Sequence, residues 1–170
     1  MKGSINIGYI GLGRRGISVL KGCLCYMEDV NILYLCDTEQ ERLDSARQAV
    51  LETKGTEPRL TNDYRDILSD PAVDAVFIMT GWSGRPQLAM EAMRAGKYTA
   101  IEVGCADTLQ ECWDLVDTYE QTGVPLMMLE NDCYFRRNLM ALNMARLGAF
   151  GQIVHCTGAY AHYLNDVDLF

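Results

Sequence analysis

An apolar run that breaks into closely spaced glycines lies near the N-terminus and limits the possible folds more than any other stretch. Residues 5–16 read Ile-Asn-Ile-Gly-Tyr-Ile-Gly-Leu-Gly-Arg-Arg-Gly, which predicts a buried strand, a tight turn and the start of a helix. A phosphate can bind at such a junction, because the first N–H groups of a helix lack partners within it and carry the positive end of its dipole. We assign the tight turn to Gly11, the close approach of the backbone to a pyrophosphate to Gly13, and close packing of helix on strand to Gly16.

A second apolar run ends in an acidic residue at the distance from the glycines that dinucleotide-binding proteins show. Residues 31–37 read Asn-Ile-Leu-Tyr-Leu-Cys-Asp, and an acid about 20 residues beyond the glycines binds the ribose of a dinucleotide. We expect Asp37 to accept hydrogen bonds from the adenosine ribose and to repel the extra phosphate of NADP, which favours NAD. Arg14 and Arg15 could host that phosphate, so NADP is the less favoured alternative. The other interpretation is that Asp37 only caps the following helix.

The rest of the chain alternates between strand and helix patterns. Further strands are predicted at 31–36, near Leu60, and at 74–80, 98–103 and 125–129, and helices at 14–27, 39–53, 63–68, 86–95, 108–122 and 134–147. Capping boxes are expected where Thr38 precedes Glu41 and where Thr108 precedes Glu111. This alternation predicts an α/β fold with a doubly wound parallel sheet, the Rossmann dinucleotide-binding arrangement.

The tail of the sequence predicts a second domain that the chain only begins. Residues 151–162 alternate in polarity like a half-buried strand, and the preceding elements leave it no second sheet to join. We expect residues 1–150 to form the dinucleotide-binding domain and 151–170 to be the start of a truncated C-terminal α+β domain for substrate and oligomerisation. Because exposed strand edges pair with other chains, we expect self-association through this tail and a homo-oligomer.

Composition and charge exclude several classes of partner. The formal net charge of −8 argues against nucleic acid, since proteins that bind it concentrate positive charge, and the ordinary apolar share argues against a membrane span. The seven cysteines form no Cys-x-x-Cys pair and only two histidines accompany them, so we expect no metal site. Thiols without a disulfide framework, and the absence of a signal-peptide pattern, favour the cytoplasm.

The loops that follow the carboxyl ends of the strands are the expected ligand-binding positions of such a sheet. Residues 80–85, Thr-Gly-Trp-Ser-Gly-Arg, would run past the middle of the cofactor. There Thr80 is a candidate contact, Trp82 offers an apolar wall with an indole N–H, and Arg85 offers positive charge near the pyrophosphate. The alternatives are that Trp82 is a partly buried packing residue and that Arg85 is a solvated charge at the start of a helix.

Several motifs in order resemble the N-terminal domain of the Gfo/Idh/MocA oxidoreductases over about residues 4–165. They are the glycine turn, Asp37, the strand from residue 74, Ala-Gly-Lys-Tyr-Thr-Ala-Ile-Glu at 95–102, and Glu130-Asn131. The resemblance implies an NAD-dependent oxidoreductase acting on a sugar or a sugar derivative. It places Glu102, Val103 and Asn131 around the nicotinamide ribose and carboxamide, with simple capping of strand ends by Glu102 and Asn131 as the alternative.

One departure from that family points to a particular branch of it. The family usually has lysine and proline after the glutamate, and the lysine serves the substrate carbonyl, whereas Val103 and Gly104 follow Glu102 in this chain. Glu102-Val103, Trp82, residues 130–134 and Tyr160-x-His162 resemble the branch that includes the family 109 glycoside hydrolases. Those enzymes keep NAD bound and remove and return one hydride within each turnover, so a redox-cycling glycosidase is the alternative to a sugar dehydrogenase.

The branch resemblance also supplies the candidate catalytic residues. Tyr160 and His162 lie two apart, on one face of the expected tail strand, and are the candidate acid and base near the sugar. Histidine has the pKa suited to general base catalysis near neutral pH. The alternative for His162 is a strand residue without a role, and the second alternative for the whole chain is a catalytically inactive nucleotide-binding module.

Overall fold

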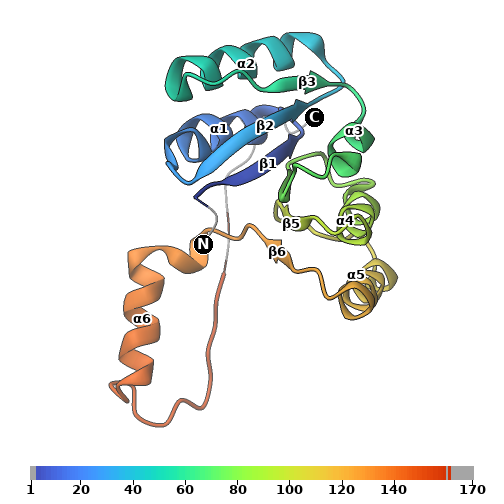
Figure 1. The fold of residues 1–170 in the computed structure, drawn as a ribbon. Coiled ribbons are helices and arrows are strands. Elements are labelled where there is room, and N and C mark those ends of the chain that lie inside the picture. The colour runs from blue at the N-terminus through green and yellow to red at the C-terminus, as the bar shows by residue number, and fades with distance from the viewer. Residues whose placement is uncertain (1–2, 160, 162–170) are drawn as a thin grey trace. The chain divides into compact units, whose positions relative to one another are not determined.

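The computed structural model describes residues 3–159 and residue 161. The chain divides into two compact units, Met1–Glu130 and Asn131–Phe170, which are described separately. The first unit contains a six-stranded parallel sheet with the strand order β3-β2-β1-β4-β5-β6 (Figure 1). Its strands are β1 (Ile5–Ile10), β2 (Val30–Cys36), β3 (Arg59–Thr61), β4 (Ala75–Ile78), β5 (Tyr98–Ile101) and β6 (Leu126–Met128).

Helices cover both faces of this sheet, so the predicted doubly wound fold is confirmed. The helices of the first unit are α1 (Arg14–Gly22), the short 3-10 helix η1 (Leu24–Tyr26), α2 (Gln40–Lys54), α3 (Tyr64–Ser69), α4 (Arg85–Arg94) and α5 (Leu109–Thr122). One buried cluster joins the sheet to α1, η1 and α2, and a second joins it to α3, α4 and α5. Burial of the two sheet faces under separate helical layers is what the continuous apolar runs of the central strands require.

The central strand β1 shows why a glycine precedes the glycine turn. A Cβ placed on Gly8 would lie 2.1 Å from Cγ2 of Ile67, a fully buried residue of α3. The next residue, Tyr9, points to the opposite face of the sheet. Its side chain is fully buried there, and its ring stacks against that of Phe77 of β4 with 6.1 Å between the ring centroids. Gly8 thus lets α3 approach the strand that leads into the glycine turn.

Of the two predicted capping boxes, the structure has one and lacks the other. The predicted box at Thr108 and Glu111 is present, with Thr108 Oγ1 accepting from the Glu111 N–H and the Glu111 carboxylate accepting from the Thr108 N–H. The box expected at Thr38 is wrong, because α2 begins at Gln40 after the N-cap residue Glu39, which makes no side-chain capping bond. Asp37 takes the Glu39 N–H instead, and this bond holds the chain extended past Thr38.

The helix predicted over residues 14–27 is two shorter pieces. α1 ends at Gly22, and Cys23 has φ −134° and ψ −69°, outside the helical region, before η1 begins. The break turns Leu24 and Cys25 into the core against α2. Burial of these two side chains decides the local backbone here, which helical spacing alone does not reveal.

The second unit contains η2 (Asp132–Tyr134) and α6 (Arg136–Arg146). The strand expected over residues 151–162 is wrong in the part that the structure describes, because residues 151–159 and 161 form no strand. The physical reason is that a strand needs a neighbour for its N–H and C=O groups, and Val154 in this stretch is 88% exposed. The proposed domain boundary between residues 150 and 151 remains a prediction.

Candidate functional site

A cavity of about 460 Å³ lies at the carboxyl ends of β1, β2 and β4. In this sheet β1 is flanked by β2 on one side and by β4 on the other, so the cavity lies where the strand order reverses. That crevice is where open α/β sheets bind their ligands. The lining residues come from the loops after these strands and from the helices that follow: Ile10, Gly11, Gly13, Cys36, Asp37, Thr38, Arg42, Asn62, Tyr64, Met79, Thr80, Gly81, Ser83, Gly84, Gln87 and Leu88.

The three glycines have the three different surroundings that their assigned roles require. Gly11 has φ +95°, and a Cβ there would lie 2.7 Å from the backbone N of Thr80. A Cβ on Gly16 would lie 2.2 Å from the carbonyl oxygen of Gly11, so α1 packs directly on the turn. Around Gly13 a Cβ would meet nothing within 4 Å, which leaves open space beside the backbone at the start of α1.

The carboxylate of Asp37 lies beside this turn and lines the cavity. It is 8% exposed, its Oδ2 accepts the Leu12 N–H at 2.6 Å, and its Oδ1 accepts the Glu39 N–H at 3.0 Å. Because Glu39, not Asp37, is the N-cap residue of α2, the interpretation of Asp37 as a simple helix cap is wrong. The carboxylate is oriented by two backbone donors while remaining at the cavity wall.

The two arginines that follow the turn have different surroundings. Arg14 is exposed at the first position of α1. Arg15 forms an ion pair with Glu102, with 3.0 Å between Nε and Oε2. The cation beside Asp37 is Arg42 of α2, whose Nη1 lies 3.5 Å from Oδ1 of Asp37. Sequence reasoning missed Arg42, because a basic residue in the first turn of a charged helix carries no motif.

Three of the predicted residues follow β4, Thr80 and Trp82 in the loop and Arg85 at the first position of α4, and they differ in exposure and contacts. Thr80 lines the cavity. Trp82 is 65% exposed, with its indole against Gly104, where a Cβ would come within 3.1 Å of the ring. Arg85 is only 3% exposed, so the alternative of a solvated charge at a helix start is wrong. Its guanidinium donates to backbone carbonyls of the loops after β4 and β5 and is not part of the cavity lining.

The residues assigned to the nicotinamide side are only partly brought together. Glu102 follows β5, its Oε1 accepts the Val103 N–H at 3.1 Å, and its other oxygen pairs with Arg15. Val103 is partly exposed in the same loop. Asn131 belongs to the second unit, and Tyr160 and His162 lie outside the described residues.

Hydrogen-bonded side chains of α3 and α4 contribute to one wall of the cavity, and the sequence did not predict them. The Glu91 carboxylate accepts Gln87 Nε2–H at 3.0 Å and the Tyr64 hydroxyl at 2.8 Å. These bonds lower the pKa of Glu91, and the bond to Glu91 raises the pKa of Tyr64. Asn62 adds a further contact, since its Nδ2 donates to the Asp37 carbonyl oxygen. The only sequence signal was a cluster of polar residues after a short strand.

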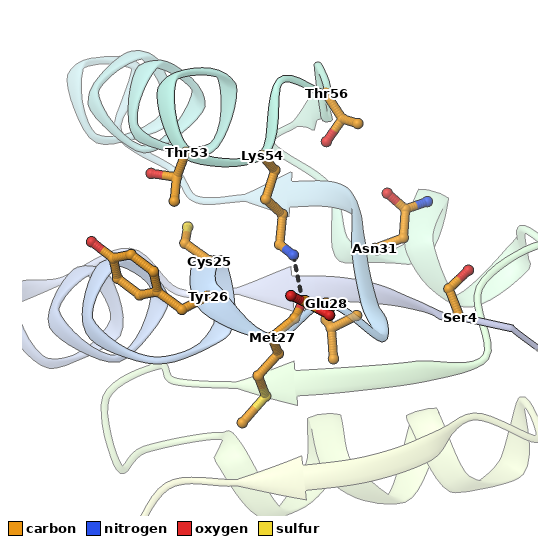
Figure 2. A pocket seen from close by; sticks show the side chains of 10 residues that line it. Ser4, Cys25, Tyr26, Met27, Glu28, Asn31, Thr53, Lys54 and Thr56 are labelled. Atoms are coloured by element: carbon orange, nitrogen blue, oxygen red, sulfur yellow. Dashed lines mark hydrogen bonds between the residues drawn. The ribbon is translucent and has the colours of Figure 1, made fainter.

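A second hollow, of about 630 Å³, lies at the amino ends of β1 and β2 (Figure 2). Lys54 from the end of α2 reaches across it, and its Nζ donates to the Met27 carbonyl at 2.6 Å. The ligand-binding crevice of such sheets lies at the carboxyl ends, so we take the cavity beside Asp37 as the candidate site. Over residues 3–159 and 161, no cluster of three or more His, Cys, Asp or Glu could hold a metal, and no helix is both long and apolar enough to cross a membrane.

The residues present fit the adenosine and pyrophosphate half of a dinucleotide. The open space at Gly13 faces the N-terminus of α1, whose N-cap supplies no side-chain capping bond, and the first N–H groups of a helix favour an anion. Asp37 supplies a fixed carboxylate for ribose hydroxyls at the adjoining wall. The arrangement can therefore hold a diphosphate and a ribose side by side.

Comparison with known proteins extends this result. The family model described as "Oxidoreductase family, NAD-binding Rossmann fold" (Gfo/Idh/MocA) matches residues 5–130. A glycosyl hydrolase family 109 protein of Shewanella baltica (strain OS195) is 42% identical over 164 residues, which cover 94% of this chain and 36% of that protein. A protein of Shewanella oneidensis named alpha-N-acetylgalactosaminidase is 38% identical with the same coverage. The chain thus spans about a third of the length of these curated relatives.

Solved structures share the fold at low sequence identity. The scyllo-inositol dehydrogenase of Lactobacillus casei with bound NAD(H) and scyllo-inositol has a TM-score of 0.77 at 20% identity, covering 87% of this chain and 42% of that one. The myo-inositol 2-dehydrogenase of Lactobacillus plantarum has a TM-score of 0.78 at 19% identity, covering 89% and 43%. These similarities establish the Rossmann architecture.

Proposed function

The chain belongs to the Gfo/Idh/MocA oxidoreductase family, and from this premise we propose that its residues 1–150 bind NAD as the cofactor half of a redox enzyme that acts on a sugar. The main support for this proposal is that Gly13 and Asp37 line the same cavity, at the point where the strand order reverses. Gly13 leaves room for a pyrophosphate, and the Asp37 carboxylate is already turned by the Leu12 and Glu39 amides.

NAD is preferred over NADP in this proposal. The Asp37 carboxylate lines the cavity where the ribose would lie, and its negative charge repels a 2′-phosphate. Arg15, one of the two arginines that favoured NADP, is engaged with Glu102. Arg42 is the cation nearest to Asp37 and reduces that repulsion, so the preference is a balance between these two side chains.

A redox-cycling glycosidase is favoured over net sugar oxidation by one observation. The glycosyl hydrolase family 109 protein and the alpha-N-acetylgalactosaminidase are 42% and 38% identical over 94% of this chain, whereas the inositol dehydrogenases are about 20% identical. When bound, the dinucleotide would supply the acceptor for a hydride from a sugar carbinol carbon and, later in the same turnover, the donor of that hydride. The carbonyl formed would make the neighbouring C–H acidic, so a base could remove its proton while the glycosidic C–O bond breaks and a C=C bond forms. The leaving oxygen would take a proton from an acid, and water would then add across the C=C bond before the carbonyl is reduced again.

Specific residues of this chain are proposed for that chemistry. Tyr160 and His162 are the proposed acid and base for the proton next to the oxidised carbon, because no lysine follows Glu102 and histidine titrates near neutral pH. Glu102, Val103 and Asn131 are proposed to surround the nicotinamide ribose and carboxamide. A sugar dehydrogenase, which was the first expectation from the sequence, is the second proposed function and is supported by the oxidoreductase family match.

Two measurements test the proposal. Calorimetric titration of the 170-residue chain with NAD tests the cofactor site, and absence of binding by both NAD and NADP contradicts it. Incubation with an aryl N-acetylgalactosaminide and with the free sugar then separates the two activities. A glycosidase releases the aryl alcohol without net NADH, whereas a dehydrogenase forms one NADH per free sugar oxidised.

Assembly and location are further parts of the proposal. We propose a homo-oligomer that uses the tail, since Ile153 and Val154 are apolar and exposed there. We propose the cytoplasm because all seven cysteines are free thiols, as a reducing compartment keeps them. Residues 151–170 are proposed as the start of the substrate and oligomerisation domain.

A further inference from the structure

Arg85 holds together the two loops that follow β4 and β5. Its Nη1 donates to the carbonyl oxygens of Glu102 at 2.9 Å, Val103 at 2.6 Å and Gly104 at 3.2 Å, and its Nη2 donates to the Thr80 carbonyl. Three consecutive carbonyls of one loop thus converge on a single nitrogen. The side chain is 3% exposed, so water cannot replace these donors.

We propose that Arg85 is a positioning residue for the nicotinamide half of the site, acting through the two loops that it joins. This inference rests on the proposed function, which places the nicotinamide beside the loop at Glu102 and Val103. The Glu102 residue is held at both ends, because its carbonyl accepts from Arg85 while its carboxylate pairs with Arg15 at the start of α1. The network therefore joins the ends of β1, β4 and β5.

Electrostatics explain why removal of the guanidinium would move these loops. Four carbonyl oxygens with partial negative charge point at one place, and without a cation between them they repel each other and lack donors. Burial lowers the pKa of Arg85 below its ordinary value, but an arginine stays charged at neutral pH. The loops would separate, and the contact of the Trp82 indole with Gly104 would be lost with them.

Arg85 acts indirectly, because its contacts are with backbone and not with the cavity. It is not among the residues that line the cavity, and its Nε has no hydrogen-bond partner in the part of the chain that the structure describes. Because its four hydrogen bonds all go to backbone carbonyls, we assign it a positioning role through the loops. The expected consequence is selective: the adenosine half at Asp37 and Gly13 stays intact when Arg85 is replaced.

The test compares NAD with ADP-ribose, which lacks the nicotinamide, on the 170-residue chain. Arg85→Met removes all four hydrogen bonds, and Arg85→Lys keeps a buried cation. Lys97→Met is the matched control, because Lys97 is also buried and its Nζ donates to the carbonyls of Asp70 at 2.7 Å and Val73 at 3.0 Å, before β4 and away from the cavity. Affinities are measured by calorimetry, and loop order by the fluorescence anisotropy of Trp82 in a Trp113→Phe background.

We expect Arg85→Met to weaken NAD by about tenfold and ADP-ribose by much less, since the lost bonds are charge-assisted and lie on the nicotinamide side. Arg85→Lys should recover part of the loss, and Lys97→Met should lower stability without changing the ratio of the two affinities. Anisotropy of Trp82 should fall in Arg85→Met only.

Two binding results overturn the inference: a ratio of NAD to ADP-ribose affinity that is unchanged in both Arg85 variants, or equal affinity of the wild-type chain for the two ligands. If Arg85→Met does not fold, the comparison of Arg85→Lys with wild type decides in the same way. If the wild-type chain binds neither ligand, the proposed function fails. Unchanged Trp82 anisotropy in Arg85→Met would separately overturn the role of Arg85 in holding the loops.

Discussion

The backbone N–H of Leu12 donates to Oδ2 of Asp37 over 2.6 Å, although 25 residues separate them in the sequence. This buried bond fastens the glycine turn after β1 to the acid at the end of β2. The second carboxylate oxygen accepts the Glu39 N–H at 3.0 Å. Asp37 is thus oriented by the fold itself, so a ribose would meet a carboxylate that needs no rearrangement.

Asp37→Ala tests the structural part of this relationship. We expect the free energy of unfolding to fall by about 1–3 kcal/mol, because the buried Leu12 N–H loses its acceptor. Asp37→Asn keeps one side-chain oxygen and should lose less. Urea unfolding followed by circular dichroism measures both variants, and an alanine variant as stable as wild type would show that the bond contributes nothing.

Two glycine substitutions in the same turn should separate cofactor binding from stability, with Gly13→Ala weakening binding and Gly11→Ala lowering stability. Gly13→Ala places its methyl group in open space at φ −61°, so we expect an unchanged melting temperature but an NAD affinity lowered by about tenfold, because the methyl occupies the approach of the pyrophosphate. Gly11→Ala forces φ +95° and a contact of 2.7 Å with the backbone at Met79 and Thr80, so it should destabilise the chain by at least about 1–3 kcal/mol. Thermal unfolding with parallel calorimetry distinguishes them, and Gly13→Ala binding NAD like wild type would count against the pyrophosphate site.

The glycines could be found from sequence because their conformation depends on local backbone geometry, and Asp37 could be found because it ends the next apolar run at the spacing of a dinucleotide-binding motif. A positive φ at Gly11 and a helix packed on Gly16 follow from a strand, a tight turn and a helix in succession. The alternation of apolar runs in turn fixes a parallel sheet. The glycine positions thus depend on neighbouring residues, whereas the bond from Leu12 to Asp37 requires β2 to lie beside β1.

The contacts of Arg85, Arg42 and Tyr64 could not be found in this way. Each depends on which loops and helices lie next to one another, and the guanidinium of Arg85 has partners 17 to 19 residues further along the chain. A charged residue at the start of a helix is usually solvated. Arg85 is buried instead because the loops after β4 and β5 surround its guanidinium with carbonyl oxygens. The predicted tail strand failed for a similar reason, because polarity alternation at Ile153 and Val154 cannot supply the neighbour that a strand requires.

The hydrogen bonds to Glu91 predict a change in acid stability. Its pKa is lowered below the ordinary value of 4.5, first by the bond from Gln87 and then by the bond from Tyr64. Because the folded pKa is the lower one, the stabilisation is fully present above about pH 4.5 and is lost as the pH falls through the folded pKa. Tyr64→Phe should therefore be less stable than wild type at neutral pH, with the two converging in acid.

Urea unfolding at a series of pH values from neutral to acid measures this convergence. Tyr119→Phe is the control, since Tyr119 lies half exposed on α5 and its hydroxyl should not change the pH profile. A Tyr64→Phe profile parallel to wild type through the acid range would show that the tyrosine bond does not hold the Glu91 carboxylate ionised.

The pairing of Asp37 with Arg42 predicts how cofactor choice can be changed. Nη1 of Arg42 lies 3.5 Å from Oδ1 of Asp37, so Asp37→Asn removes the charge that repels a 2′-phosphate and leaves the guanidinium without its anion. We expect the ratio of NAD to NADP affinity to fall by about tenfold, with NADP binding that weakens as salt screens the new contact. Adding Arg42→Gln should remove this gain while leaving NAD binding close to that of the single variant. Calorimetric titration with both dinucleotides at low and high salt tests the pair, and NADP affinity that persists in the double variant would show that another cation receives the phosphate.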